Sequence, residues 1–256
     1  MAKSVDFCVF SVLVTGSNQG IGLGLVKRFL ELPSPPKWVF ATTWKGEETK
    51  ELKELACKHP NLVVLQLDVT KPESIQAALK EVQKCVGEGG LTILYNNAGV
   101  WAMNDLQTEN AKDMMRVYSV DVIGTLQMSQ AFLPLLKKAA QRSPCQGLST
   151  SKAAIINMSS ITASIELMAG FEQFKMIGYR CTKAALNMLT KCQSLGYSAD
   201  GIMSVAMHPG IVNTTNNPAG KVSVEESTQG IITVLPKLCE EDNGTFVDYL
   251  GRRLPW

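Results

Sequence analysis

The 256-residue sequence has little histidine, little net charge and no long apolar run. It contains only His59 and His208, and its seven cysteines are never spaced C-x-x-C, which excludes a histidine-rich metal site, a thiolate zinc site and a disulfide framework. The 25 basic and 23 acidic residues leave a net charge of +2, too small a field to hold nucleic acid. No apolar run reaches the ~20 residues that cross a bilayer. These absences predict a cytoplasmic protein with no metal, nucleic acid or membrane among its partners.

Seven short apolar runs rich in Val, Ile and Leu alternate with longer amphipathic stretches. Runs that are apolar throughout indicate strands covered on both faces, as in a parallel sheet. We predict strands at 8–14, 38–43, 62–67, 91–95, 153–158, 202–207 and 245–247, and helices at 20–32, 47–58, 72–86, 111–140, 179–198 and 223–240. This order predicts one α/β domain over residues 1–256, a doubly wound sheet of seven parallel strands with helices on both faces.

A glycine-rich turn, Thr15–Gly22, follows the first predicted strand and leads into a helix. Glycines there let the backbone approach a pyrophosphate, whose charge then rests on amides at the helix N-terminus. Ordinary turns also use glycine, and the spacing G-x-x-x-G-x-G differs from the commoner dinucleotide fingerprint. The position between a strand and a helix therefore carries the prediction of a dinucleotide site.

The second predicted strand ends in Thr42-Thr43-Trp44-Lys45 and lacks the carboxylate that would bind the ribose 2′-hydroxyl of NAD. With no carboxylate to repel a 2′-phosphate and with Lys45 able to pair with it, we expect NADP, and NADPH in preference to NADH. The alternative interpretation of Lys45 is a solvated loop lysine. Asp68, at the end of the third strand, is placed to meet the adenine ring, although it could equally cap the helix that begins near Pro72.

Tyr179 and Lys183 lie one turn apart on the same face of a predicted helix. A tyrosine with a pKa of about 10 holds its proton tightly, and a lysine ammonium beside it lowers that pKa and makes the phenol a usable general acid. Ser160 ends the fifth strand, where it could donate a hydrogen bond to a substrate carbonyl oxygen or simply cap the backbone. The carboxyl ends of the strands form the ligand crevice of such a sheet, so we expect these side chains to meet there.

Taken together, these motifs resemble the short-chain dehydrogenase/reductase family. The resemblance covers essentially the whole chain, and segments 133–140 and 243–256 are similar to Sniffer-type carbonyl reductases and bacterial C-factor proteins. It implies a single-domain Rossmann fold and an NADPH-dependent carbonyl reductase that turns a ketone or aldehyde into an alcohol. The motifs that carry it are Thr15–Gly22, Asn96-Asn97-Ala98-Gly99, Ser160, Tyr179 with Lys183, and His208–Thr214.

The resemblance also implies a role for each matching residue. Tyr179 would act as general acid or base, Lys183 would bind the nicotinamide ribose and lower the tyrosine pKa, and Ser160 would orient the carbonyl. The residues expected to contact the cofactor are Gly16, Ser17, Asn18, Gln19, Gly20, Ile21, Gly22, Trp44, Lys45, Asp68, Val69, Asn97, Ala98, Gly99, Tyr179, Lys183, Pro209, Gly210, Val212 and Thr214.

Three positions depart from the family pattern. Gln19 and Trp44 stand where many NADP-using relatives have basic residues. Asp121, three positions before Gly124, stands in the place of the asparagine that is the family's fourth catalytic residue. An ionised Asp121 close to the catalytic pair would oppose formation of the tyrosinate and favour reduction over oxidation. It also keeps open a second function, an NADP-binding regulator or redox sensor with little turnover.

The segment between Ser160 and Tyr179 is longer than usual in the family and rich in large apolar residues. We expect residues 161–178, 211–224 and the C-terminus to form a pocket for a small apolar or aromatic carbonyl. The alternative is that half of these apolar side chains belong to the core. The stretch 213–222 is short and polar, which predicts a shallow site. The sequence is compatible with either a monomer or a homodimer.

Overall fold

The computed structural model describes residues 7–44, 50–215 and 217–256. Its centre is one seven-stranded parallel sheet with the order β3-β2-β1-β4-β5-β6-β7, which confirms the predicted doubly wound α/β architecture. The strands are β1 (Ser11–Val14), β2 (Trp38–Thr43), β3 (Leu62–Gln66), β4 (Ile93–Asn96), β5 (Ala154–Met158), β6 (Met203–His208) and β7 (Phe246–Asp248).

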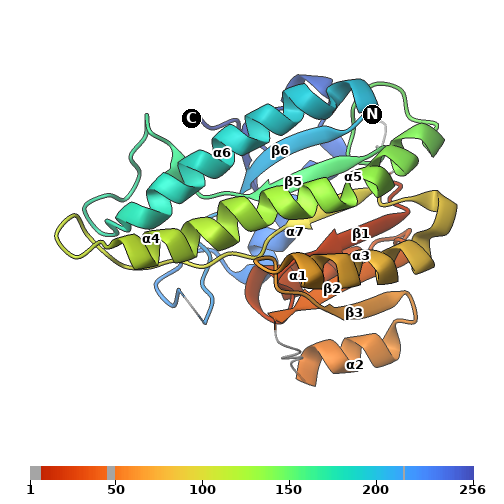
Figure 1. Cartoon of the computed structure of the whole chain (residues 1–256), viewed down its shortest axis with the longest axis horizontal. Coiled ribbons are helices and arrows are strands. Elements are labelled where there is room, and N and C mark those ends of the chain that lie inside the picture. Colours follow the sequence, from red (N-terminus) through yellow and green to blue (C-terminus); the bar gives the residue numbers. More distant parts are fainter. Residues whose placement is uncertain (1–6, 45–49, 216) are drawn as a thin grey trace.

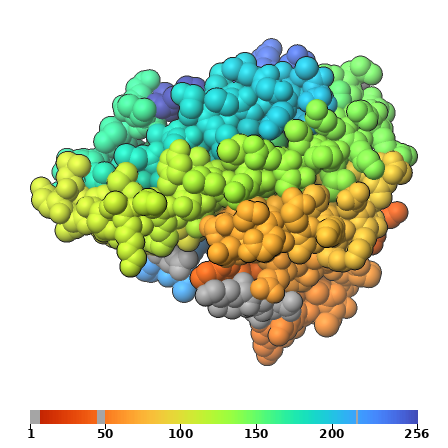
Figure 2. Space-filling view, viewed as in Figure 1, coloured from red at the N-terminus to blue at the C-terminus, as the bar shows by residue number. Residues whose placement is uncertain are grey.

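Helices cover both faces of this sheet, which explains why the strands are apolar on both sides. In β1, Val12 and Val14 face one core and Leu13 faces the other. Figure 1 shows helices in front of the sheet, and Figure 2 shows their side chains covering that face. Those are α3 (Pro72–Val86), α5 (Thr125–Arg142) and α6 (Ile177–Tyr197), while α1 (Gly20–Leu30), α2 (Lys50–Lys58) and α7 (Val224–Val234) pack on the opposite face.

The single helix predicted over 111–140 is divided into two. Helix α4 (Ala111–Tyr118) is followed by a π-helical turn, Ser119–Gly124, before α5 begins. One wider turn leaves the amphipathic pattern nearly unchanged, so no spacing of apolar residues indicates it. Such π turns occur often at functional sites, and this one contains Asp121.

Other helix boundaries also differ from the predicted ones. The helix predicted to reach residue 240 ends at Val234, because Pro236 has no N–H to continue the α-helical hydrogen bonds, and the chain goes on as the short turn Leu235–Lys237. Residues 47–49 of the predicted second helix lie outside the described residues. Short 3₁₀ turns occur at Gly87–Gly89, Ile161–Ala163, Ser198–Asp200, Leu235–Lys237 and Glu240–Asp242.

The strand order reverses between β1 and β4, and in open α/β sheets the ligand crevice lies at the carboxyl ends of the strands at such a point. The segments that follow β4 and β5 project from the same end of the molecule (Figure 1). They are joined where the Ile177 amide donates to the Asn104 carbonyl over 3.1 Å. In the described ranges, no helix has both the length and the apolar character needed to cross a membrane.

Candidate active site

The glycine turn between β1 and α1 is built by close backbone packing. Gly16 has φ +66°, a left-handed conformation that side chains rarely adopt. A Cβ on Gly22 would lie 2.2 Å from the Gly16 carbonyl oxygen, so only glycine fits there. The Ser17 hydroxyl donates to the Val14 carbonyl over 2.6 Å, and this bond fixes the start of the turn. The result is an α1 N-terminus with backbone amides and, in the described chain, no acidic side chain in its first turn.

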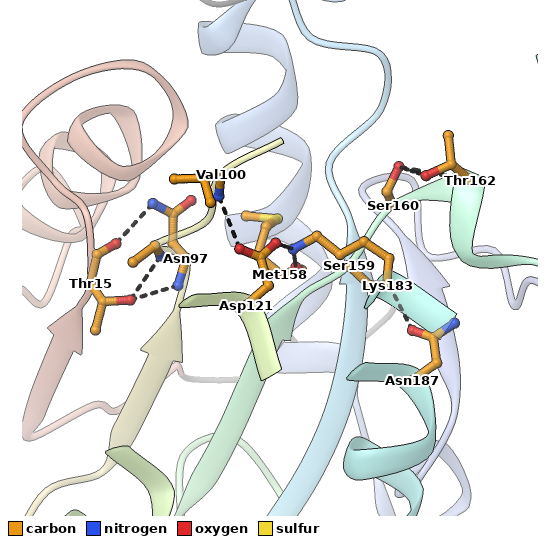
Figure 3. A network of polar contacts seen from close by, with 11 residues as sticks. Thr15, Asn97, Val100, Asp121, Met158, Ser159, Ser160, Thr162, Lys183 and Asn187 are labelled. Carbon is orange, nitrogen blue, oxygen red and sulfur yellow. Dashed lines mark hydrogen bonds and ion pairs between the residues drawn. The ribbon is translucent and has the colours of Figure 1, made fainter. Parts of the chain in front are cut away.

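The end of β4 is tied directly to this turn (Figure 3). The Asn97 side-chain amide donates to the Thr15 carbonyl over 2.8 Å and to the Gly16 carbonyl over 3.1 Å. The backbone amides of Asn97 and Ala98 both donate to the Thr15 hydroxyl over 2.9 Å. The two motifs predicted to share one ligand therefore lie against each other.

The other predicted cofactor contacts lie at the ends of β2 and β3. The Trp44 indole donates to one Asp68 carboxylate oxygen over 3.2 Å, and Thr70 donates its amide and hydroxyl to the other. Although burial raises the pKa of Asp68, these hydrogen bonds hold it below its usual value. Asp68 does not cap α3, whose N-cap residue, Lys71, has no side-chain cap. Lys45 lies outside the described residues, so the predicted phosphate contact stays a prediction.

The π-helical turn packs against Val69 and Gly99, which follow the carboxyl ends of β3 and β4. A Cβ on Gly124 would lie 2.8 Å from Val69 Cγ2, and a Cβ on Gly99 would lie 3.1 Å from Asp121 Oδ2. The two glycines therefore allow this turn to approach the ends of β3 and β4. That approach brings the Asp121 carboxylate into the site.

Lys183 and Asp121 form a buried ion pair. Their side chains are 4% and 0% exposed, and Nζ lies 2.8 Å from Oδ2. Lys183 also donates to the Met158 carbonyl over 2.8 Å, and the Val100 amide donates to Asp121 Oδ1 over 2.9 Å (Figure 3). Although burial lowers the pKa of Lys183, the adjacent carboxylate raises it above its usual value, so the ammonium is retained.

Tyr179 differs from its sequence prediction in one respect. Its ring centre is 5.5 Å from Lys183 Nζ, and Tyr179 lines the same cavity as Ser160. The expected lowering of the Tyr179 pKa is wrong, because burial outweighs the opposing effect of Lys183, and Asp121 raises the pKa further. The phenol therefore keeps its proton at neutral pH.

Ser160 caps the backbone, as one interpretation of its position expects, while its donation to a substrate carbonyl stays a prediction. Its hydroxyl oxygen accepts hydrogen bonds from the Thr162 amide over 3.2 Å and hydroxyl over 2.9 Å, so it caps the 3₁₀ turn Ile161–Ala163 (Figure 3). It also lies at the wall of a cavity of about 270 Å³. That cavity is lined by Ile21, Trp101, Met103, Ser159, Ser160, Ile161, Thr162, Ala169, Gly170, Phe174, Met176, Tyr179, His208, Pro209, Gly210, Ile211, Val212, Thr214 and Asn217.

The 161–178 segment supplies only part of the expected apolar wall. Phe174 and Met176 line the cavity, but Ile165 is 75% exposed and Leu167 46% exposed, so these two neither line it nor join a core. The C-terminal residues are also not among the lining residues. The Trp256 carbonyl instead accepts hydrogen bonds from the segment itself, at the Glu166 amide and the Ser164 hydroxyl.

Sequence reasoning missed four lining residues, of which Ser159 directly precedes the predicted Ser160. Trp101 and Met103 follow the Asn-Ala-Gly motif, and continuing from the carboxyl end of β4 would have suggested them. His208 Nδ1 accepts a hydrogen bond from the Ile161 amide over 3.1 Å, and burial lowers the pKa of His208 to about 4. Its imidazole is therefore neutral near pH 7, and it supports the Ser160 turn.

Known proteins share this architecture. The profile of the short chain dehydrogenase family matches residues 11–222. The chain belongs to the short chain dehydrogenase family. The crystal structure of NADPH-bound carbonyl reductase from chicken fatty liver is 49% identical to it, with a TM-score of 0.92 over 97% of this chain and 100% of that one. Carbonyl reductase Sniffer of D. melanogaster is 36% identical, with the same TM-score and coverage.

A bacterial relative extends the comparison. C-signal of Myxococcus xanthus is 30% identical over 173 residues, which make up 66% of this chain and 94% of that protein. The resemblance to carbonyl reductases and C-factor proteins, inferred from the motifs, is thereby confirmed. As a short chain dehydrogenase, the protein is an NAD(P)-dependent oxidoreductase.

Proposed function

We propose that this protein is an NADPH-dependent carbonyl reductase that converts a small apolar or aromatic ketone or aldehyde into the alcohol. The observation that carries the proposal is that Ser160 and Tyr179 line the same largely apolar cavity, with Lys183 one helical turn from Tyr179. The similarity to an NADPH-bound carbonyl reductase supports the same conclusion.

The residues present fit such a cofactor. Because Gly22 has no side chain, the backbone at Gly16 can pack directly against it. The resulting turn presents backbone amides at the position where a pyrophosphate would bind. Pro209, Gly210 and Val212 would hold the nicotinamide end, since they line the cavity together with Tyr179. When bound, NADPH would supply the hydride.

Side chains of the protein would supply the proton that the carbonyl oxygen needs. Tyr179 would donate its phenolic proton to the carbonyl oxygen, so that one hydride and one proton turn C=O into CH–OH. Its raised pKa suits this acid role, because a phenol must be protonated before it can donate. Ser160 would hold the carbonyl oxygen next to the phenol. Lys183 donates one of its three N–H groups to Met158 and forms an ion pair with Asp121, and a remaining N–H would bind a ribose hydroxyl.

The preference for NADPH over NADH is supported by the end of β2. Thr42, Thr43 and Trp44 offer no carboxylate to bind a ribose 2′-hydroxyl or repel a 2′-phosphate. Dissociation constants for NADPH and NADH, measured for the unaltered protein and for Lys45→Ala, test this. Equal or tighter NADH binding contradicts the proposal.

One observation favours the second candidate, an NADP-binding regulator with little turnover. Asp121 already occupies Lys183 through a direct ion pair. A panel of aliphatic and aromatic carbonyls with NADPH, followed at the nicotinamide absorbance, separates the two functions. We expect turnover that Tyr179→Phe lowers by roughly 10²–10⁴-fold. Tight NADPH binding without turnover of any carbonyl would support the regulator instead.

A further inference from the structure

The cavity wall between Ser160 and Tyr179 has no helix or strand of its own over residues 168–176. Ala169, Gly170 and Phe174 line the cavity from this segment. Met168 and Met176, at its two ends, have φ values of +43° and +44°, a left-handed backbone that non-glycine residues rarely adopt. Such backbone persists only where surrounding contacts determine it, so something must hold this wall in place.

Arg180 makes those contacts. Its side chain follows Tyr179 at the start of α6 and is buried, with the residue 6% exposed. Nε donates to the Lys175 carbonyl over 2.8 Å, and Nη2 donates to the carbonyls of Phe174 and Ala169 over 2.8 and 3.0 Å. Its guanidinium carbon also lies 5.3 Å from the centre of the Phe171 ring. One side chain therefore contacts both ends and the middle of the segment.

This arginine is buried without an acidic partner. Among the described residues no carboxylate forms an ion pair with Arg180, and burial lowers its pKa from the usual value. An apolar side chain would be easier to bury than a cation held only by carbonyl dipoles and an aromatic ring. A guanidinium differs from an apolar side chain because its planar N–H groups bind several main-chain carbonyls at once and fix their relative positions.

We propose that Arg180 is a positioning residue that sets the shape of the substrate pocket and so determines which carbonyls the enzyme accepts. Neighbouring helical residues point about 100° apart, so Tyr179 reaches the cavity while Arg180 reaches the wall. The wall is thereby fixed to the same helical turn that carries the proton donor. This inference rests on the proposed reductase function, but its physical basis is testable without turnover.

The test compares Arg180→Lys with the unaltered protein and with Arg142→Lys, a control at the exposed end of α5. Lysine keeps the charge but loses the fork. Hydrogen exchange by mass spectrometry should show faster amide exchange in 168–176, by roughly tenfold for one lost charge-assisted bond, with the central strands unchanged. The KM for carbonyls should rise by roughly tenfold on the same basis, most for the bulkiest, while kcat and the NADPH dissociation constant stay near their original values.

Each other result overturns the inference. Unchanged exchange in 168–176 means that Arg180 does not hold the wall, and faster exchange with unchanged KM means that the wall does not select substrates. A joint fall in kcat and NADPH affinity places the effect on Lys183, in the same helical turn, instead. If Arg180→Lys does not fold, Phe171→Leu keeps the hydrogen bonds and should give a smaller effect in the same direction. Absence of turnover in the unaltered protein refutes the reductase proposal alone, since hydrogen exchange still reports on Arg180.

Discussion

Replacing Asp121 by asparagine removes one buried charge and almost nothing else. The amide oxygen of the new side chain can still accept from the Val100 amide, which donates to Oδ1 over 2.9 Å in the native chain. What disappears is the carboxylate 2.8 Å from Lys183 Nζ. Coulomb's law gives about 6 kcal/mol for that pair at an effective dielectric constant near 20. Breaking one partner of a buried pair costs less than this in practice, about 3–5 kcal/mol.

Thermal and denaturant unfolding at neutral pH should therefore show Asp121→Asn less stable by about 3–5 kcal/mol. For a chain of this size that corresponds to a fall in Tm of roughly 6–20 °C. Glu81→Gln provides the control, because Glu81 pairs with Lys84 at the surface and should cost at most about 1 kcal/mol. The double variant Asp121→Asn/Lys183→Met should recover most of the loss, since it leaves no uncompensated charge.

The stability difference between the native protein and Asp121→Asn should depend on pH in a defined direction. The folded-state pKa of Lys183 is raised, so its contribution to stability is complete below the unfolded-state pKa and is lost only as pH rises through the folded value. In Asp121→Asn, Lys183 is buried without a counter-ion, so burial lowers its pKa in the folded state. The resulting loss of stability is greatest at low pH, where the unfolded chain binds a proton at this lysine and the folded chain resists it. The stability difference between the two proteins should therefore narrow from pH 7 to pH 9. Equal stability at neutral pH would refute the ion pair's contribution.

The same variant should change the pH profile of alcohol oxidation. Burial raises the pKa of Asp121, and the adjacent Lys183 ammonium opposes that rise. With the two as an ion pair and Tyr179 protonated, the charges are −1, +1 and 0, so ionising the phenol leaves a net negative cluster. With asparagine the cluster begins at +1, and its first proton leaves more easily, whichever of the coupled groups releases it. The oxidation rate should rise at a lower pH in Asp121→Asn. An unchanged or higher midpoint would show that the carboxylate does not influence the tyrosine.

Other predictions concern single groups. Tyr179→Phe should lower carbonyl reduction by roughly 10²–10⁴-fold while NADPH titration shows unchanged affinity, because the hydroxyl faces the cavity; normal turnover would contradict the proton-donor role. Gly22→Ala should abolish NADPH binding in a fluorescence titration, since its Cβ would lie 2.2 Å from the Gly16 carbonyl oxygen; native affinity would exclude the turn as the pyrophosphate site. Trp44→Phe removes the donor to Asp68 and should weaken NADPH binding by a few fold, measured in the same titration with Glu81→Gln as control; unchanged affinity would place Trp44 outside the adenosine site.

The fold was predictable because each element has a local signature in the residue pattern. Leu13, Phe40 and Ile155 are buried on one face of the sheet, and their neighbours in the strands are buried on the other face. A strand buried on both faces must be apolar throughout, so the uninterrupted apolar runs predict it. The π-helical turn was not predictable, because it changes the hydrogen-bond pattern without changing the order of apolar residues. Asp121 consequently could be placed near Lys183 by family position, but not recognised as its direct partner.

The electrostatics were harder to predict than the fold. A sequence shows that Lys183 is one turn from Tyr179, but not that burial outweighs the lysine's effect on the tyrosine pKa. Arg180 illustrates the same limit. Its partners are main-chain carbonyls, which every residue has, so no pattern of residue types marks the contact.

The first turns of α6 carry two buried cations, Arg180 and Lys183, which are stabilised in different ways next to Tyr179. Lys183 is neutralised by Asp121 and anchored to β5 through the Met158 carbonyl, whereas Arg180 keeps its charge among the carbonyls of the pocket wall. Tyr179 is thus fixed on one side to the sheet that would carry the cofactor and on the other to the segment that would contact the substrate. A displacement of this helical turn would move the proton donor and the wall together, so the distance between them stays constant. In the proposed reductase, selection of the substrate and delivery of its proton would both depend on this one helical turn.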